Sequence, residues 1–151
     1  MDALTLLRKD HSAVKLLFSK FDRISKTDHD RRSELFAQIR RELQLHSRAE
    51  EQIFYPALKA LNGAGQRLAS QALKEHEEID TLLIQISRLK PSDKNFDDNF
   101  EMLLESMEYH VEEEEGEIFQ FAEENCSAQE LEELGNQIEQ RRRFLDREMA
   151  A

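Results

Sequence analysis

The sequence has no tryptophan, one cysteine, four glycines and two prolines among its 151 residues. A single thiol, Cys126, cannot form an internal disulfide, so we expect a reducing compartment and place the protein in the cytoplasm. So few turn-forming residues disfavour a β-sandwich or a β-barrel, which needs a turn about every ten residues. The same scarcity suits long helices joined by short connections.

Long hydrophobic runs are also missing from the sequence. No stretch is long enough to cross a bilayer, and residues 1–4 lack the basic and apolar regions of a signal peptide. Positive charge is scarce as well, since 32 acidic residues against 21 basic ones give a net charge of −11. An acidic surface repels phosphate, so we expect neither nucleic acid nor a membrane as a partner.

Apolar residues recur every three or four positions through most of the chain, as they do on one face of an amphipathic helix. Polar or helix-breaking residues interrupt this pattern at 25–30, at 62–65 and near Pro91. We therefore predict an all-α protein, an up-down-up-down four-helix bundle over about residues 2–124 within one domain of residues 1–151. The stretch 62–65, Asn-Gly-Ala-Gly, is expected to end the second helix and to form a flexible connector.

A short extra C-terminal helix is predicted over about residues 127–148. Ser127 and Glu130 have the spacing of a capping box, in which each side chain bonds the other residue's backbone N–H. The apolar stripe that follows is thin, so this helix packs either on the side of the bundle or in a dimer. We accordingly expect a monomer or a homodimer.

The middles of the second and fourth predicted helices share one pattern. His46 is followed by Glu50 four residues later, and His110 is followed by Glu114 at the same spacing. A second glutamate comes directly after each of these. Positions i and i+4 of a helix lie on one face, about 6 Å apart, so each segment presents an imidazole and a carboxylate to the same point.

Counting residues from the turns places two further histidines, His11 and His76, at the same depth in the bundle as this repeated pattern. Such groups are costly to bury without partners, and a metal ion is the most direct partner. His29 lies in a polar turn and is expected at the surface. We predict a metal site formed by His11, His46, Glu50, His76, His110 and Glu114.

Six nitrogen and oxygen ligands without a thiolate suit two ions better than one four-coordinate structural zinc. We expect Glu50 and Glu114 to bridge the two ions. His11 and His46 then bind one ion, and His76 and His110 bind the other. This ligand chemistry favours iron, with manganese or zinc as possible occupants. The Glu-x-x-His pattern of ferritin-like bundles is absent, and so is a complete zinc-protease helix.

Four helices carry, in order, a lone His, a His-x-x-x-Glu, a second lone His and a second His-x-x-x-Glu. This order resembles the hemerythrin-like (HHE cation-binding) family from about Leu4 to Glu124. The resemblance implies two iron ions bridged by carboxylates and an oxo or hydroxo group, with O2, NO or peroxide as small ligands. It implies a sensing or stress-protective role, with at most weak peroxidase- or oxidase-like activity. The alternatives are a di-iron oxidoreductase, an iron-donating repair enzyme and a metal-stabilised interaction module.

Two positions depart from the oxygen-carrying hemerythrins. These have a second His four residues after the third-helix His, where this chain has Asp80, a possible additional ligand. Their last carboxylate comes five residues after the final His, which makes Glu115 an alternative to the better aligned Glu114. Losing an imidazole favours the ferric state, and thus redox, NO-linked or iron-responsive roles over reversible O2 carriage. Tyr55 and Tyr109 are interpreted as packing residues.

Overall fold

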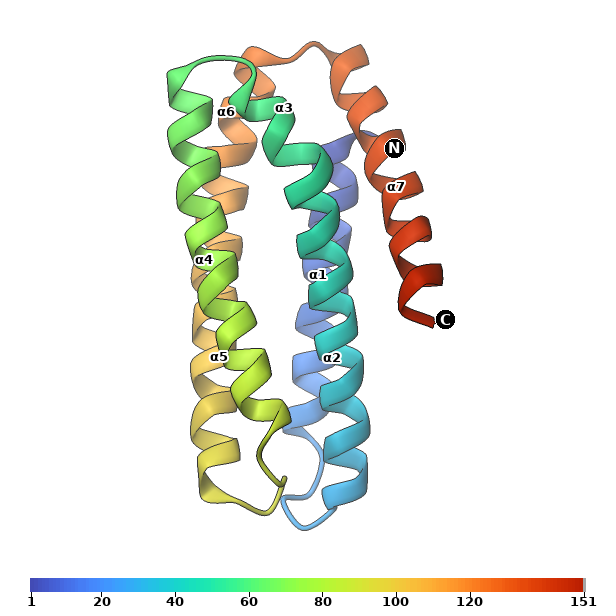
Figure 1. Ribbon diagram of the computed structural model, residues 1–151, viewed down its shortest axis with the longest axis vertical. Helices are drawn as coiled ribbons and strands as arrows, with labels where there is room; N and C mark the ends of the chain where they lie inside the picture. The colour runs from blue at the N-terminus through green and yellow to red at the C-terminus, as the bar shows by residue number, and fades with distance from the viewer. Residues whose placement is uncertain (151) are drawn as a thin grey trace.

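The computed structural model describes residues 1–150, and all regular secondary structure in this part is helical (Figure 1). The first helix of the bundle is α1 (Ala3–Asp22) and the third is α4 (Gly63–Ser87). The second is built from α2 (His29–Ala49), a π-helical turn η1 (Glu50–Phe54) and α3 (Tyr55–Lys59). The fourth is built from α5 (Lys94–Glu113), a π-helical turn η2 (Glu114–Ile118) and α6 (Phe119–Asn125). The predicted four-helix bundle is confirmed.

Each of these four long helices begins at a short polar side chain that caps its first turn. Asp2 accepts a hydrogen bond from the backbone N–H of Thr5 at 2.9 Å. Asp28, Asn62 and Asp93 play the same part at the other three helices. Such caps satisfy backbone donors that have no partner inside the helix, and this defines where each helix starts.

The prediction of a flexible connector at residues 62–65 is wrong. The second bundle helix already ends at Lys59, and Asn62 accepts a hydrogen bond from Gly65 at 3.1 Å as the cap of α4. Gly63 and Gly65 therefore lie in the first turn of α4. A Cβ on Gly65 would lie 2.1 Å from the carbonyl oxygen of Leu58, so this glycine is needed for the close approach of α4 to α3.

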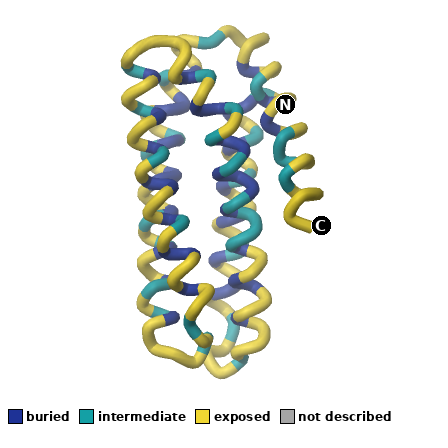
Figure 2. The backbone as a smooth tube through the Cα atoms, in the orientation of Figure 1, coloured by how far each residue is buried: buried dark blue, intermediate teal, exposed yellow. Residues whose placement is uncertain are grey.

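The core consists of two apolar clusters stacked along the bundle. One lies toward the loops after α1 and α4 and is rich in phenylalanine, including Phe21, Phe96 and Phe100. The other lies between the opposite ends of the helices and includes Phe54 and Phe119. Figure 2 shows buried residues along the inward sides of the helices and exposed ones outside. The midsection between the two clusters is where the predicted metal site falls.

A fifth helix, α7 (Ala128–Ala150), packs against α1 and α2 on the side of the bundle (Figure 1). The predicted capping box is present, since Ser127 Oγ accepts from the N–H of Glu130 at 3.1 Å and Glu130 Oε1 accepts from the N–H of Ser127 at 3.0 Å. The extra C-terminal helix is thus confirmed, although with 23 residues it is not short and is close in length to α1 and α4. Within residues 1–150, no helix has the length and apolarity required to traverse a membrane.

Two glycines in one helical turn give a test of this packing. Gly65→Ala should lower the free energy of unfolding by about 1–3 kcal/mol, because the added methyl group meets backbone and must push α4 from α3. Gly63→Ala is the matched control, since a Cβ there has nothing within 4 Å, and its stability should be unchanged or rise by up to about 1 kcal/mol. Denaturant unfolding measures both. Equal effects of the two changes would contradict the close approach.

Candidate metal centre

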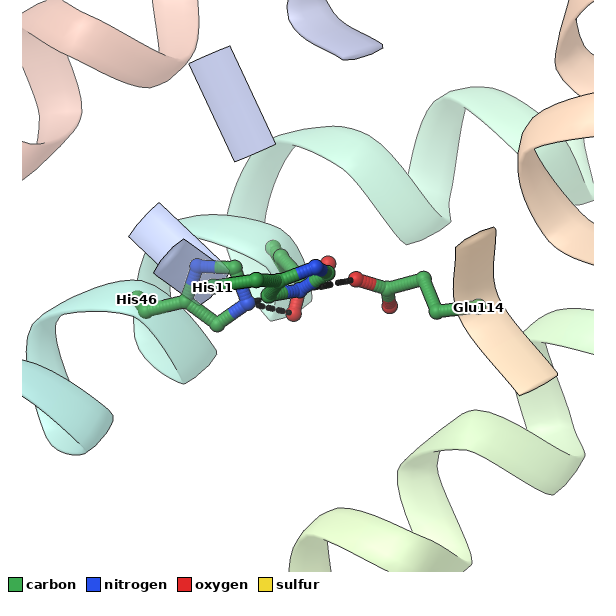
Figure 3. A group of neighbouring side chains, drawn as sticks. His11, His46 and Glu114 are labelled. Carbon is green, nitrogen blue, oxygen red and sulfur yellow. Dashed lines mark ion pairs between the residues drawn. The ribbon is translucent and has the colours of Figure 1, made fainter. Parts of the chain in front are cut away.

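Six buried polar side chains meet in the midsection of the bundle, and they are the six that the sequence analysis selected. Every one of them is at most 4% exposed, and the two glutamates are fully buried. Each helix of the bundle contributes one histidine, and the glutamates come from the first residues of the two π-helical turns. Figure 3 shows three of these side chains, His11, His46 and Glu114, converging on one point.

The six side chains form two groups of four ligand atoms. His11 and His46 belong to the first group, His76 and His110 belong to the second, and both groups share Glu50 and Glu114. Within each group the ligand atoms lie within 4.8 Å of one another. A shared pair of carboxylates between two histidine pairs is the arrangement expected of a site for two ions.

The distances within the groups show that the Nε2 atoms point inward. His11 Nε2 lies 3.1 Å from Glu114 Oε1 (Figure 3). His46 Nε2 lies 2.9 Å from Glu50 Oε1. In the second group, His76 Nε2 lies 3.3 Å from Glu50 Oε1. His110 Nε2 lies 3.4 Å from Glu114 Oε2. All four rings therefore present the same nitrogen to the shared carboxylates.

Four further carboxylates fix the orientation of the histidine rings from outside. Each histidine Nδ1 lies 2.7–3.1 Å from one carboxylate oxygen, in the pairs His11–Glu115, His46–Asp10, His76–Glu51 and His110–Glu75. An Nδ1–H that donates to a carboxylate leaves the Nε2 lone pair directed at the centre. This is the usual support of metal-binding histidines, and it also makes Nε2 a stronger electron-pair donor to a metal.

These outer carboxylates follow an internal pseudo-two-fold symmetry that relates α1 and α2 to α4 and α5. The acid directly before each lone histidine, Asp10 or Glu75, reaches the histidine of the next helix. The acid directly after each shared glutamate, Glu51 or Glu115, reaches a lone histidine. The sequence analysis missed the outer role of these acids. The repeated acid before each lone histidine was the available signal.

The two π-helical turns bring an aromatic residue to the centre on each side. In a regular α-helix, Tyr55 would lie on the opposite face from His46, because nine residues rotate through about 900°. The π-helical turn takes up one extra residue, and Tyr55 is turned inward instead. Its hydroxyl donates to Glu114 Oε2 and lies 3.2 Å from His76 Nε2. Phe119 occupies the symmetric position and stacks on His11 at 6.0 Å.

The remaining candidates lie outside the two groups. Asp80, a possible ligand from its spacing, instead accepts hydrogen bonds from Arg48 at 3.2 Å on the partly exposed side of α4. Arg48 draws it away, and Glu51 holds the ring of His76 in its place. Glu115 holds a ring from outside and does not point between the histidines. Tyr109 is 56% exposed, and His29, the first residue of α2, is exposed as expected.

The chemistry of the six inner side chains fits a bound metal. Five buried ligand atoms have no hydrogen-bond partner outside the cluster among residues 1–150, namely His11 Nε2, His46 Nε2, both carboxylate oxygens of Glu50 and Glu114 Oε1. Unpartnered buried polar atoms are rare and costly in proteins. Here all five face the same centre. The molecule thus contains a buried His/Glu cluster consistent with a di-metal site.

Charges around the cluster shift the proton affinities of its members. Burial lowers the pKa of His110, but Glu114 and Glu75 beside the ring outweigh burial and raise that pKa from 6.5 to about 10. The same opposition of burial and carboxylates raises the pKa of His46 well above its usual value. Burial raises the pKa of Glu114, yet hydrogen bonds with Glu50, His11 and His110 hold it well below its usual range. Without a metal, the cluster therefore holds protons in place of cations.

Known proteins of similar sequence share this architecture. Residues 2–122 match the family model described as the hemerythrin HHE cation binding domain. A hemerythrin HHE cation binding domain-containing protein from Mycobacterium kansasii has a crystal structure that matches with a TM-score of 0.84. It is 28% identical, and the match covers 95% of this chain and 86% of that one.

Two relatives are longer than this chain. An uncharacterized hemerythrin-like protein of Schizosaccharomyces pombe is 30% identical, over 91% of this chain and 67% of its own length. A DNA nickase of Nostoc is 29% identical over 91% of this chain, which spans only 38% of that protein. The family model covers most of the chain and includes every residue of the His/Glu cluster. The chain belongs to the hemerythrin HHE cation-binding domain family.

Proposed function

We propose that this chain is a non-haem di-iron protein that binds or reacts with O2, NO or peroxide in a sensing or stress-protective role. The proposal assigns His11, His46, His76 and His110 as terminal ligands and Glu50 and Glu114 as bridges. One observation carries it: five buried ligand atoms in one place have no other partner, while the outer nitrogen of every histidine is already held.

Charge balance also favours two cations. Two buried carboxylates form the inner set and four more surround the histidines, whereas the nearby cations are two arginines at the rim, Arg48 and Arg142. A pair of divalent ions offsets this excess of negative charge. Neutral imidazoles with carboxylates and no thiolate suit iron, and this preference agrees with the family of the chain.

The space beside the cluster suits a very small ligand. An enclosed cavity of about 10 Å³ adjoins His11, His46 and His110, and apolar side chains such as Ile79 and Met107 form most of its wall. A volume of this size admits about one water-sized molecule. Larger organic substrates do not fit here without rearrangement of the core. The size and polarity of the cavity therefore support O2, NO or peroxide as the class of ligand.

Two bridged irons supply one-electron steps at adjacent centres and a Lewis-acid pair for a small oxidising ligand. The chain itself holds the ligand nitrogens inward, excludes bulk water with two apolar clusters and keeps one proton on the Tyr55 hydroxyl. Burial, together with Glu114 and Glu50, raises the pKa of that phenol well above its usual value. Tyr55 thus remains a hydrogen-bond donor at the edge of the second group.

Tyr55 is also the observation that supports a di-iron oxidoreductase as the second candidate, because a buried phenol beside redox metals is a possible one-electron donor. The nickase activity in the name of the Nostoc relative is disfavoured for this chain, because a net charge of −11 opposes an approach to DNA. For the compartment we propose the cytoplasm, which suits a chain with a single cysteine.

Metal content is the direct test of the proposal. Protein produced with iron should contain close to two irons per chain by elemental analysis, and the double variant His46→Ala/His110→Ala should contain almost none because each ion loses a ligand. The exposed His29 provides the control, and His29→Ala should keep both irons. One zinc per chain that persists in the double variant would exclude the di-iron assignment.

Adjacent glutamates distinguish a bridge from an outer support. Glu114→Gln should remove both metals, because its carboxylate belongs to both ligand groups. Glu115→Gln should keep two metals at saturation but weaken their affinity by roughly tenfold to a hundredfold, since it only orients His11. Competition with a chelator measures the difference. If Glu115→Gln is the variant that loses its metals, the carboxylate five residues after His110 is the bridge and Glu114 is not.

The metal-free protein should lose stability as the pH rises. A histidine in the unfolded chain has a pKa near 6.5, whereas His110 in the folded chain has a pKa of about 10. The extra proton bound by the folded state contributes its full stability below about pH 6.5, and this contribution is lost as the pH rises toward 10. The unfolding temperature of chelator-treated protein should fall across this window, whereas the metal-loaded protein should not show that fall. A metal-free protein that becomes more stable over this range would contradict the proton-loaded cluster.

A further inference from the structure

The C-terminal helix reaches the edge of the proposed metal centre through one side chain. Arg142 of α7 donates from Nη1 to Asp10 Oδ1 at 2.7 Å, and its Nη2 pairs with Glu42 of α2. The other oxygen of Asp10 lies 3.1 Å from His46 Nδ1. One carboxylate therefore connects a guanidinium on α7 to an inward-facing imidazole. The helix itself lies outside residues 2–122, which the family model matches.

The pseudo-two-fold symmetry provides an internal comparison for this contact. Glu75 is the counterpart of Asp10, and it holds His110 Nδ1 at 2.7 Å. Its second oxygen is buried and has no hydrogen-bond partner among residues 1–150. Asp10 thus has a cation on its outer oxygen and Glu75 has none. The difference arises because α7 covers α1 and α2, whereas no fifth helix of the described chain covers the symmetric pair α4 and α5 (Figure 1).

A second arginine acts on the other side of the centre, but its situation differs. Arg48 bonds Glu51, which holds His76, and it also bonds Asp80. It belongs to the bundle and is 37% exposed, so its charge is divided between two acids and screened by solvent. Arg142 is 25% exposed, and Asp10 is 14% exposed. The contact from α7 is therefore the more shielded of the two.

We infer that Arg142 is a positioning residue through which the C-terminal helix tunes the first of the two proposed metals. The inference rests on the proposed di-iron function. A carboxylate that accepts the Nδ1–H of a coordinated histidine increases the electron donation of the ring to the metal. Arg142 withdraws negative charge from Asp10, and this makes His46 a weaker donor. A weaker donor and a nearby cation both favour the ferrous state of the first metal, so its reduction potential rises.

Redox titration of the iron-loaded protein, followed optically, tests the inference. Arg142→Gln should lower one of the two midpoint potentials by about 59 mV, which corresponds to about a tenfold change in the equilibrium constant of a one-electron reduction. Arg142→Lys keeps the cation and should restore most of the potential. Asp10→Asn removes the carboxylate charge and should shift the same potential in the opposite direction, which a general loosening of the helix would not do.

Two control variants separate charge from helix docking. Arg143 is 71% exposed and pairs only with Glu139 on the same helix, so Arg143→Gln should leave both potentials unchanged. Arg41 joins α2 to Asp146 of α7 without touching Asp10, so Arg41→Gln should loosen α7 and still leave the potentials in place. An Arg41→Gln shift as large as that of Arg142→Gln would overturn the inference, as would no shift in Arg142→Gln.

The same series distinguishes failure of the inference from failure of the proposed function. Wild-type protein that takes up two irons and titrates in two one-electron steps supports the di-iron proposal before any variant is compared. If wild-type protein takes up no iron, the proposed function and the inference are overturned together. If it takes up two irons and the Arg142 and Asp10 variants shift the same potential in the same direction, only the inference is overturned.

Discussion

The structure depends on one constraint, the burial of two carboxylates and four imidazoles in the middle of a narrow bundle. These groups separate the core into two apolar clusters, and the one hydrogen-bonding group that the members of these clusters direct at them is the Tyr55 hydroxyl. Removing polar groups from water without compensation costs more than most single interactions in a fold contribute. The outer carboxylates satisfy one nitrogen of each ring and leave the other directed at the centre. Cations at the inner positions would compensate for this cost.

The second feature that organises the molecule is the pair of π-helical turns. Each starts at one of the two shared glutamates and changes the rotation of the helix just beyond it. This change turns Tyr55 and Phe119 toward the centre, where a regular helix would direct them outward. The chemical difference between these two symmetric residues gives the second group of ligands a hydroxyl and the first group a flat apolar ring. A symmetric backbone thus supports an asymmetric centre.

The extra helix adds a further asymmetry from outside the bundle. By covering α1 and α2, α7 provides a cation to one outer carboxylate while its symmetric counterpart keeps a bare buried oxygen. The midsection of the bundle therefore has neighbours of different charge on its two sides. Outer partners of this kind orient the ligands of a metal site and tune their basicity.

The sequence by itself determined the helical class, the four-helix bundle, the capping box at Ser127 and the six inner residues, because helical periodicity and counting from the turns are local rules. It did not determine whether residues 62–65 end one helix or begin the next, a choice that the structure makes by capping α4 with Asn62 and placing Gly65 against Leu58. Only the tertiary structure decided the outer partners. Asp80 accepts a hydrogen bond from Arg48 and does not reach the cluster. The helix α7 packs on the side of the bundle through contacts between residues about one hundred positions apart. Spacing along one helix carries no information about such partners, because they depend on how different helices are rotated against each other.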